Sequence, residues 1–324
     1  MSQKSNIEWT DATWNPVVGC TKVSPGCKNC YAETLHSRRN AAYVEGKAVP
    51  EQYAMPFETV QTLPERLDAP LHWKKPRRIF VNSMSDLFHE DIADEFIQAV
   101  FTVMSKARQH TFQVLTKRAK RMREILTRWQ HHGLTLREGY GVCLPNAWLG
   151  VSVEDQKRAD ERIPELLRTP AAVRFISAEP LLGAVELKGL GEERAARVPS
   201  GGLDWVICGG ESGKDARPMH PDWARGLRDQ CEAAGVPFFF KQWGEWAPAI
   251  AGDVVTLSGG RFSADTRVDD LERAIEHGGA TMQRYGKKVA GRLLDGFLYD
   301  GMPGITFKGA PVSWRSSNQG AKAR

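Results

Sequence analysis

The stretch RIFVNSMSDLFHEDIADEFIQAVFTVM, residues 78–104, contains the repeating unit from which the fold is predicted. A short apolar run at 78–81 ends in polar residues. An amphipathic stretch with apolar residues near i, i+3, i+4 and i+7 follows over 94–104. The first segment is typical of a buried strand and the second of a helix that covers a sheet. Together they predict one strand followed by one crossover helix.

From residue 78 onward the same unit recurs at intervals of roughly 25–35 residues, the length that a strand and its crossover helix require. The runs expected as strands are 14–19, 78–81, 111–115, 147–151, 173–176, 204–208 and 236–240. A further helix is expected over 221–231, ending near Gly235. These elements predict an α/β fold with a parallel sheet, either a partial βα barrel of TIM type or a doubly wound open sheet.

Polar or glycine residues follow nearly every predicted strand. A parallel barrel gathers such residues at the carboxyl ends of its strands, whereas a doubly wound sheet concentrates them at one switch point. The pattern therefore favours the partial barrel. The residues in question are Asn82, Ser83, Asp86, Lys117, Ser152, Glu154, Glu179, Gly209, Gly210, Glu211 and Lys241.

Three cysteines lie in one short stretch, Cys20-Thr-Lys-Val-Ser-Pro-Gly-Cys27-Lys-Asn-Cys30, with the spacing C-x6-C-x2-C. Three thiolates on a tetrahedral metal or on a four-iron cluster leave one coordination position open. The alternative is a structural zinc site with a remote fourth ligand, for which His36 and Cys143 are candidates. The spacing alone leaves both interpretations open.

Bulk composition limits the class of protein. The chain has 324 residues, 41% of them hydrophobic, a net charge of +5, and no long uncharged apolar run. We therefore expect a cytoplasmic protein without a membrane span or a signal peptide. Six cysteines in a chain of this length do not predict a secreted disulfide framework.

The segment 104–137 carries nine Lys or Arg residues and a single acid, Glu124. A basic segment of this kind is a candidate contact for the phosphate backbone of a nucleic acid. The alternative is a solvated helix face with no partner.

The last eighty residues lose the strand–helix rhythm. We expect a barrel over 1–247, an irregular cap or lid over 248–315, and a disordered tail over 316–324.

Nearly the whole chain resembles a phage-associated family of three-Cys-motif proteins of unknown function. The matching stretches are Trp14-Asn-Pro16, residues 23–33, residues 82–88, residues 208–213, residues 238–246 and residues 286–292. The cysteine loop that opens a βα barrel is also similar to that of the radical S-adenosylmethionine (SAM) superfamily, whose usual spacing is C-x3-C-x2-C. In that superfamily three cysteines hold a [4Fe–4S] cluster and leave one iron for SAM.

The resemblance implies an iron–sulfur enzyme that reductively cleaves SAM and acts on an unidentified substrate, for which the basic segment 104–137 makes a nucleic acid one candidate. It also implies a three-Cys-motif partner protein. The implied cluster ligands are Cys20, Cys27 and Cys30, and the implied cofactor contacts are Asn82, Ser83, Asp86, Ser152, Glu154, Gly209, Gly210 and Glu211. The implied catalytic residues are Lys117, Glu179 and Lys241. The alternatives are a zinc protein that binds or cuts nucleic acid, and a non-catalytic phage accessory factor with a structural metal.

Overall fold

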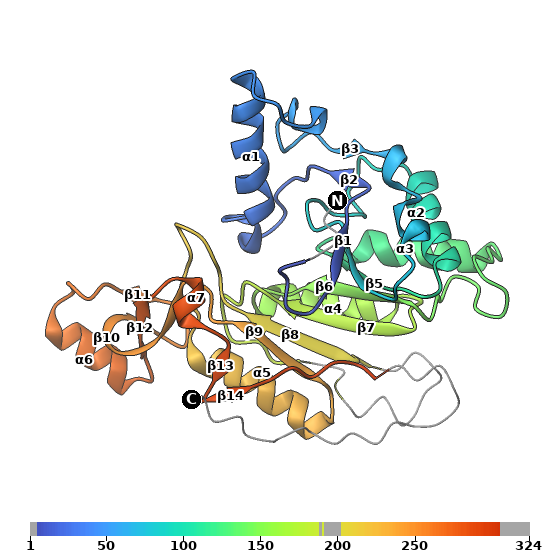
Figure 1. The fold of residues 1–324 in the computed structure, drawn as a ribbon. Helices are drawn as coiled ribbons and strands as arrows, with labels where there is room; N and C mark the ends of the chain where they lie inside the picture. Colours follow the sequence, from blue (N-terminus) through green and yellow to red (C-terminus); the bar gives the residue numbers. More distant parts are fainter. Residues whose placement is uncertain (1–4, 188–189, 191–201, 305–324) are drawn as a thin grey trace. The chain divides into compact units, whose positions relative to one another are not determined.

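The computed structural model describes residues 5–187, 190 and 202–304 (Figure 1). They divide into two compact units, and each is described by itself. The first comprises the described parts of 1–153 and 157–177, and the second comprises 154–156 and the described residues from 178 onward. The predicted tail at 316–324 and the end of the predicted cap lie outside the described residues.

Seven strands form one sheet in the order β1-β4-β5-β6-β7-β8-β9. Their bounds are β1 Ala12–Trp14, β4 Arg78–Val81, β5 Thr111–Thr116, β6 Ala147–Ser152, β7 Val173–Ala178, β8 Trp205–Gly209 and β9 Phe238–Gln242. Within each unit, neighbouring strands of this sheet pair in parallel. The spatial order follows the chain order, as in a βα barrel, and does not reverse at a switch point. The predicted α/β fold with a partial parallel barrel is confirmed, and the doubly wound alternative is wrong.

Three helices of the first unit follow strands of the sheet, and a fourth follows the cysteine loop. They are α1 Tyr31–Val44, α2 Asp94–Lys106, α3 Ala119–His131 and α4 Gln156–Leu167. Short 3-10 helices lie at Pro25–Cys27, Glu51–Tyr53, Pro64–Arg66 and Ala69–His72, and a small antiparallel pair joins β2 Val17–Val18 to β3 Gln61–Thr62. The predicted helix at 94–104 is confirmed as α2, whose apolar side buries Ile97, Phe101 and Met104.

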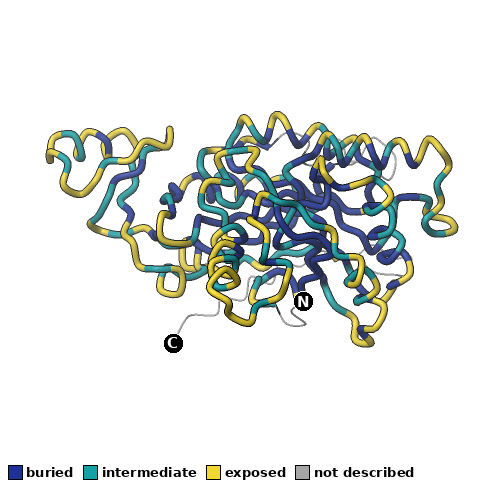
Figure 2. The backbone as a smooth tube through the Cα atoms, turned by 90° about the horizontal axis from the view of Figure 1, so that it is seen from above, coloured by how far each residue is buried: buried dark blue, intermediate teal, exposed yellow. Residues whose placement is uncertain are grey.

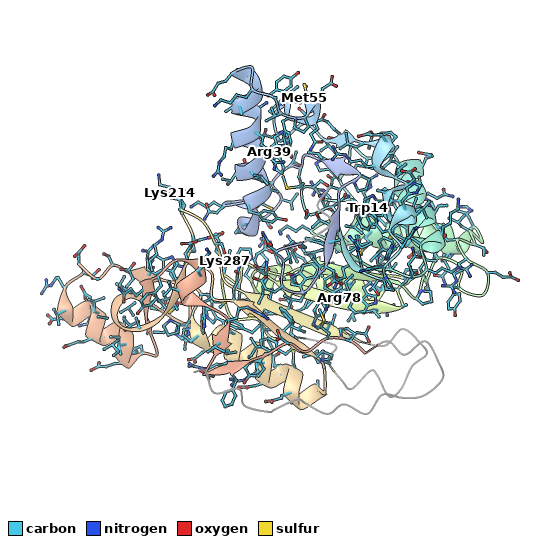
Figure 3. All side chains as sticks on the ribbon, in the orientation of Figure 1. Trp14, Arg39, Met55, Arg78, Lys214 and Lys287 are labelled. Carbon is cyan, nitrogen blue, oxygen red and sulfur yellow. The ribbon has the colours of Figure 1, made fainter. Side chains whose placement is uncertain are left out.

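The core of the first unit is built from strands that are buried on both faces. Every residue of β6 and β7 is buried, and Figure 2 colours the buried residues dark blue along the backbone. Position 150 requires glycine, because a Cβ there would lie 2.5 Å from the Phe175 ring. Trp14 of β1 is fully buried, whereas Arg78, at the start of β4, is half-buried and pairs with Asp11 at 2.9 Å (Figure 3).

The second unit contains β8, β9 and α5 Pro221–Ala234. The predicted helix over 221–231 is confirmed, with Pro221 in its first turn and Gly235 at its end in the left-handed conformation, φ +63°. His220 caps its start, because the imidazole Nδ1 accepts a hydrogen bond from the Asp222 backbone N–H at 3.1 Å.

Regular pairing also occurs within 246–304, most of which shows no strand–helix rhythm in the sequence. The elements are β10 Trp246–Val255, β11 Arg261–Phe262, α6 Val268–Glu276, β12 Ala280–Arg284, α7 Lys287–Ala290, β13 Leu293–Leu294 and β14 Phe297–Leu298. β10 is the central strand of a three-stranded sheet with β11 and β12, and its register shifts between Pro248 and Asp253. The shift breaks the period-two pattern that reveals strands in a sequence.

Among the described residues, none of the helices combines the length and the apolar character that a bilayer crossing needs.

Candidate functional site

The three cysteines lie on the loop between β2 and α1. Cys20 follows Gly19 directly, Cys27 ends a 3-10 turn, and Cys30 is the residue before the first turn of α1. All three thiols are free and half-buried. Cys20 and Cys30 both pack against the buried cluster of Ala32, Phe57 and Met84. The loop is thus anchored on the first unit by two of its three cysteines.

Gly19 fixes the start of the cysteine loop. Its φ is +91°, and a Cβ at this position would lie 2.3 Å from the Thr59 carbonyl oxygen. The next residue, Cys20, donates its backbone N–H to the Phe57 carbonyl at 2.9 Å. Gly19 also forms a parallel bridge with Ser85, after the end of β4. The loop therefore opens beside the carboxyl end of β4, on the side where a parallel barrel holds its site.

Arg118 links the cysteine loop to the ends of β4 and β5. Its Nη1 donates to the Cys20 sulfur at 3.6 Å and to the Asp86 carboxylate at 3.2 Å. Its Nη2 donates to the Thr21 hydroxyl at 2.9 Å, and its Nε donates to Glu90 at 2.7 Å. The Arg118 side chain is only 4% exposed.

The ionisation of Cys20 reflects its burial and these neighbours. Burial raises the pKa of the Cys20 thiol to about 11, and the nearby Asp86 carboxylate raises it further, whereas Arg118 opposes both effects. Without a bound metal, the Cys20 side chain is therefore a neutral thiol at pH 7.

Asp86 is a hydrogen-bond hub. Its Oδ1 accepts from the Phe88 N–H at 3.0 Å and from the Thr116 hydroxyl at 2.6 Å. Its Oδ2 accepts from the Lys117 N–H at 3.0 Å and from Arg118. These bonds use most of the acceptor capacity of one carboxylate, so the chief effect of Asp86 is to hold the ends of β4 and β5 together.

Asn82 and Ser83 lie directly after β4. Asn82 is buried with φ +60°, and its side-chain oxygen accepts from the Val17 N–H at 3.4 Å. Within the described part of the chain, its side-chain Nδ2 has no hydrogen-bond partner. Ser83 donates its hydroxyl to Asn15 at 3.2 Å, and its carbonyl accepts a bond from the Tyr31 hydroxyl. The residue after Cys30 is thereby tied to the segment after β4.

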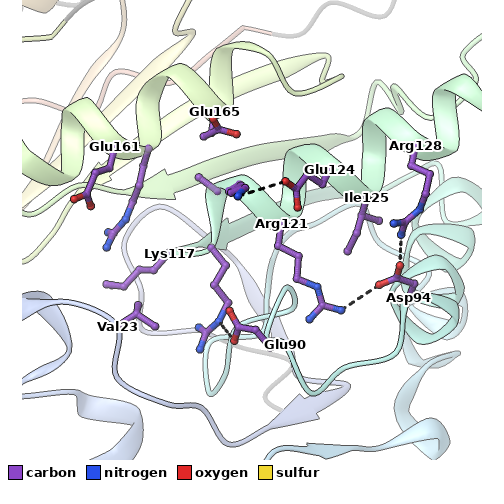
Figure 4. A pocket seen from close by; sticks show the side chains of 14 residues that line it. Val23, Glu90, Asp94, Lys117, Arg121, Glu124, Ile125, Arg128, Glu161 and Glu165 are labelled. Atoms are coloured by element: carbon purple, nitrogen blue, oxygen red, sulfur yellow. Dashed lines mark hydrogen bonds and ion pairs between the residues drawn. The ribbon is translucent and has the colours of Figure 1, made fainter.

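A groove with a volume of about 610 Å³ lies in the first unit beside α3 (Figure 4). Val23 of the cysteine loop and Lys117 both line it. Across 5–187, 190 and 202–304, the Lys117 ammonium has no ion-pair or hydrogen-bond partner, although its backbone N–H donates to Asp86. Lys117 is therefore a cation next to the cysteine loop that is available to a ligand.

Several other cations of the basic segment are neutralised within the protein. Arg121 and Arg128 both pair with Asp94, at the start of α2 (Figure 4). Arg123 pairs with Glu165 of α4. Asp94 and Glu165 lie outside the segment 104–137. The count of nine cations within the segment is therefore larger than the number that remains free to bind a partner.

Two further predicted contacts follow β6. Ser152 is buried at the end of this strand, and its carbonyl accepts from Arg162 Nη1 at 2.8 Å. Glu154 belongs to the second unit and is buried, and its carbonyl accepts from the Leu182 N–H at 2.7 Å.

In the second unit, Glu179 and Lys241 come together as an ion pair. The Lys241 ammonium donates to Glu179 Oε1 at 2.8 Å and to Oε2 at 3.0 Å. Gln242 also donates to Glu179 Oε1, at 3.1 Å, and shares the same nitrogen with the Ser212 hydroxyl. The cluster joins the end of β9 to the segments after β7 and β8.

Two glycines at the end of β8, Gly209 and Gly210, allow this packing. A Cβ on Gly209 would lie 3.3 Å from the Glu179 carboxyl carbon, and one on Gly210 would lie 1.9 Å from the Trp243 carbonyl oxygen. The sequence predicted that a cofactor approaches the backbone closely at Gly210, but the Trp243 backbone occupies that position. Glu211 is buried and accepts from the Arg217 guanidinium at 2.5 and 2.8 Å.

Neither His36 nor Cys143, the two candidates for a fourth zinc ligand, forms a metal-binding group with the three cysteines in the described part of the chain. Among the residues that the structure describes, which include Cys20, Cys27 and Cys30, no group of three or more His, Cys, Asp or Glu side chains is arranged to hold a metal ion. His36 donates its Nε2–H to the Met55 carbonyl at 2.8 Å, and its ring packs against Tyr53 and Phe57. Burial raises the pKa of the Cys143 thiol.

Sequence reasoning missed Arg118, Gln242 and Arg217. Arg118 stands next to Lys117 after a predicted strand, and that position was its only signal. Gln242 and Arg217 carried no signal, because the acids that they bind are identified only by the folded chain.

Comparison with known proteins gives a family but no characterised relative. Searches of curated proteins and of solved structures found no match. The family model described as "Protein of unknown function (DUF5131)" matches residues 4–303, which include both units and every candidate site residue. The chain therefore belongs to the DUF5131 family of proteins of unknown function.

Proposed function

We propose that this protein binds an iron–sulfur cluster through Cys20, Cys27 and Cys30 and reductively cleaves SAM. The observation that carries the proposal is the position of the cysteine loop. It opens beside the carboxyl end of β4, in a parallel sheet whose strands follow chain order. Enzymes of the radical SAM superfamily, which the sequence resembles, combine the same two features, a three-cysteine loop and a βα barrel.

The donor set fits a cluster in its chemistry. Soft thiolates are the usual ligands of iron–sulfur clusters, and each thiolate binds a different iron. The three sulfurs would therefore bind three different irons and would not surround one metal ion. Cys20 and Cys30 share one apolar support, the cluster of Ala32, Phe57 and Met84, which would limit solvent access to the metal.

When bound and reduced by a low-potential donor, such a cluster supplies one electron that breaks a carbon–sulfur bond of SAM, giving methionine and a deoxyadenosyl radical. The protein's own part is to bind and orient SAM and to exclude water. Asn82 offers an unpaired buried amide and Ser83 a hydroxyl next to the loop. Asp86 holds Lys117 and Arg118 in place.

The remaining candidate residues would have the roles that the resemblance implies. Lys117 would pair with a carboxylate or phosphate in the groove beside α3. Ser152 would contact the ribose of SAM, and the Glu179–Lys241 pair would bind substrate. The Glu211 carboxylate is engaged by Arg217, so a ligand would have to displace that pair.

Metal analysis tests the proposal. After anaerobic reconstitution we expect about four iron and four sulfide per chain. Incubation with SAM and dithionite should then yield deoxyadenosine and methionine, and Cys20→Ala should abolish this turnover. Stoichiometric zinc with no iron after reconstitution would refute the proposal.

A second candidate is a zinc protein that binds or cuts nucleic acid. The free Lys117 ammonium and the exposed Lys120, which both line the groove, favour it. Zinc in place of iron, together with tight oligonucleotide binding at low salt, would support it. A third candidate, a non-catalytic phage accessory factor, predicts that Cys20→Ala lowers stability while no SAM is turned over by either protein.

A further inference from the structure

The Arg118 guanidinium divides its donors between the cysteine loop and two carboxylates. Toward the loop it donates to the Cys20 sulfur at 3.6 Å, the Thr21 hydroxyl at 2.9 Å and the Thr21 carbonyl at 3.5 Å. Away from the loop it donates to Asp86 and Glu90. Among the residues that the structure describes, Cys20 is the only one of the three cysteines whose sulfur accepts a hydrogen bond from Arg118.

The position of Arg118 is fixed from both sides. Its side chain is 4% exposed, and that of Asp86 is 8% exposed, so solvent does little to screen this pair. The Asp86 carboxylate is itself held by Thr116 and by the Lys117 N–H. If the guanidinium turned away from Cys20, the buried Asp86 carboxylate would lose its ion-pair partner. The free-energy cost of that loss exceeds the cost of breaking the weak bond to the Cys20 sulfur.

A hydrogen bond to a ligating sulfur stabilises the more negative, reduced state of an iron–sulfur cluster, and so raises its reduction potential. A buried cation beside the sulfur acts in the same direction. Asp86 acts in the opposite direction, as does the more exposed Glu90. Removing the guanidinium would take away the stabilising bond and leave the Asp86 charge beside Cys20 uncompensated.

We propose that Arg118 is a positioning residue that holds the Cys20 end of the loop and raises the reduction potential of the cluster through the Cys20 sulfur. This inference rests on the proposed function, because it concerns the cluster bound there. It assigns Arg118 no contact with SAM or with a substrate.

The test is a redox titration of the reconstituted protein, followed by the electron spin signal of the reduced cluster. We compare the wild type with Arg118→Gln and Arg118→Lys. Arg123→Gln is the matched control, because Arg123 lies on α3 and pairs with Glu165, away from the cysteine loop. Iron content and thermal unfolding are measured on every variant.

We expect Arg118→Gln to lower the midpoint potential by enough to change the ratio of reduced to oxidised cluster at least tenfold, about 59 mV for a one-electron couple. Arg118→Lys, which keeps the charge but lacks the planar fork, should shift it in the same direction by less. Arg123→Gln should leave it unchanged. If Arg118→Gln fails to fold, Arg118→Lys carries the test.

Two outcomes would overturn the inference and are distinguishable. Equal potentials in the wild type and in the Arg118 variants, with full iron content in all of them, would overturn the role of Arg118 and leave the cluster intact. A wild type that takes up no iron would overturn the proposed function and this inference with it.

Discussion

The carboxylate of Glu179, the residue after β7, accepts both of its closest hydrogen bonds from the single ammonium of Lys241 on β9, at 2.8 and 3.0 Å. The two side chains are 18% and 14% exposed, so water contributes little to the solvation of either charge. The pair therefore depends on both partners being present.

Glu179→Gln should destabilise the protein by about 1–3 kcal/mol, because it leaves the Lys241 ammonium largely buried beside a neutral amide. The double variant Glu179→Gln with Lys241→Met should lose less than the sum of the two single changes, since it removes both charges. Urea unfolding of all four proteins measures this coupling. Strictly additive losses would show that the two charges do not depend on each other.

The Gly19→Ala substitution should destabilise the first unit by about 2–4 kcal/mol. The alanine has to adopt a left-handed φ, and its Cβ would lie 2.3 Å from the Thr59 carbonyl oxygen. That oxygen belongs to the backbone and cannot move aside alone. Gly46→Ala is the control, because its φ is also positive, +75°, while nothing lies within 4 Å of the added atom. It should cost only about 1 kcal/mol. Equal losses in thermal unfolding would mean that the contact with Thr59 does not constrain the loop.

Asp295→Asn should lower stability at pH 7 by about 1 kcal/mol, a value reduced for the partial exposure of the site. Hydrogen bonds from Arg225, and next from Arg228, hold the pKa of Asp295 below its ordinary value. Asparagine tolerates the left-handed φ of +53° at this position, so the substitution removes mainly the charge.

The pH dependence of that difference has a definite sign. Because the folded-state pKa of Asp295 is depressed, its contribution is complete above the unfolded-state pKa of about 3.9. It is lost as the pH falls through the lower folded-state pKa. Urea unfolding from pH 7 to pH 3 should therefore show the two proteins converging in acid, and a gap that stays constant down to pH 3 would contradict the assignment.

Alkylation of Cys20 in the metal-free protein should be slow and steeply dependent on pH. With a pKa of about 11, mainly from burial, only about one Cys20 thiol in a thousand is ionised at pH 8. The rate should rise about tenfold per pH unit between pH 7 and pH 10. Mass spectrometry of the peptide that contains Cys20 measures it after timed iodoacetamide treatment. A plateau already reached at pH 9 would show that the thiol ionises more easily than its surroundings indicate.

Local patterns in the sequence were sufficient for six of the seven strands of the sheet and for two helices. The first strand was predicted over 14–19, whereas β1 is Ala12–Trp14 and Val17–Val18 pairs with β3 outside this sheet. The strands around Phe80, Phe112 and Phe175 are short apolar runs, and such runs are readable because both faces of a parallel sheet are buried. The helix α5 was readable because Pro221 and Gly235 mark its ends. The three-stranded sheet around β10 was not readable, because a register shift interrupts its alternation.

The partners of the site residues could not be predicted, because they depend on pairings between distant parts of the chain. Glu211 stands in a glycine-rich stretch that suggested a solvated or ligand-binding carboxylate, yet it is buried against Arg217. The basic segment suggested a free charged face, yet Asp94 of another helix pairs with two of its arginines. A sequence shows which charges are near each other along the chain, and folding decides which of them meet in space.

The measurement that bears most directly on the account is the electron spin resonance spectrum of the anaerobically reconstituted and reduced protein, recorded with and without SAM. If Cys20, Cys27 and Cys30 hold a four-iron cluster with one iron left open, binding of SAM to that iron must change the spectrum, and Cys27→Ala must lose the signal. A spectrum that is identical with and without SAM, in a protein that carries its full complement of iron and sulfide, would contradict the claim.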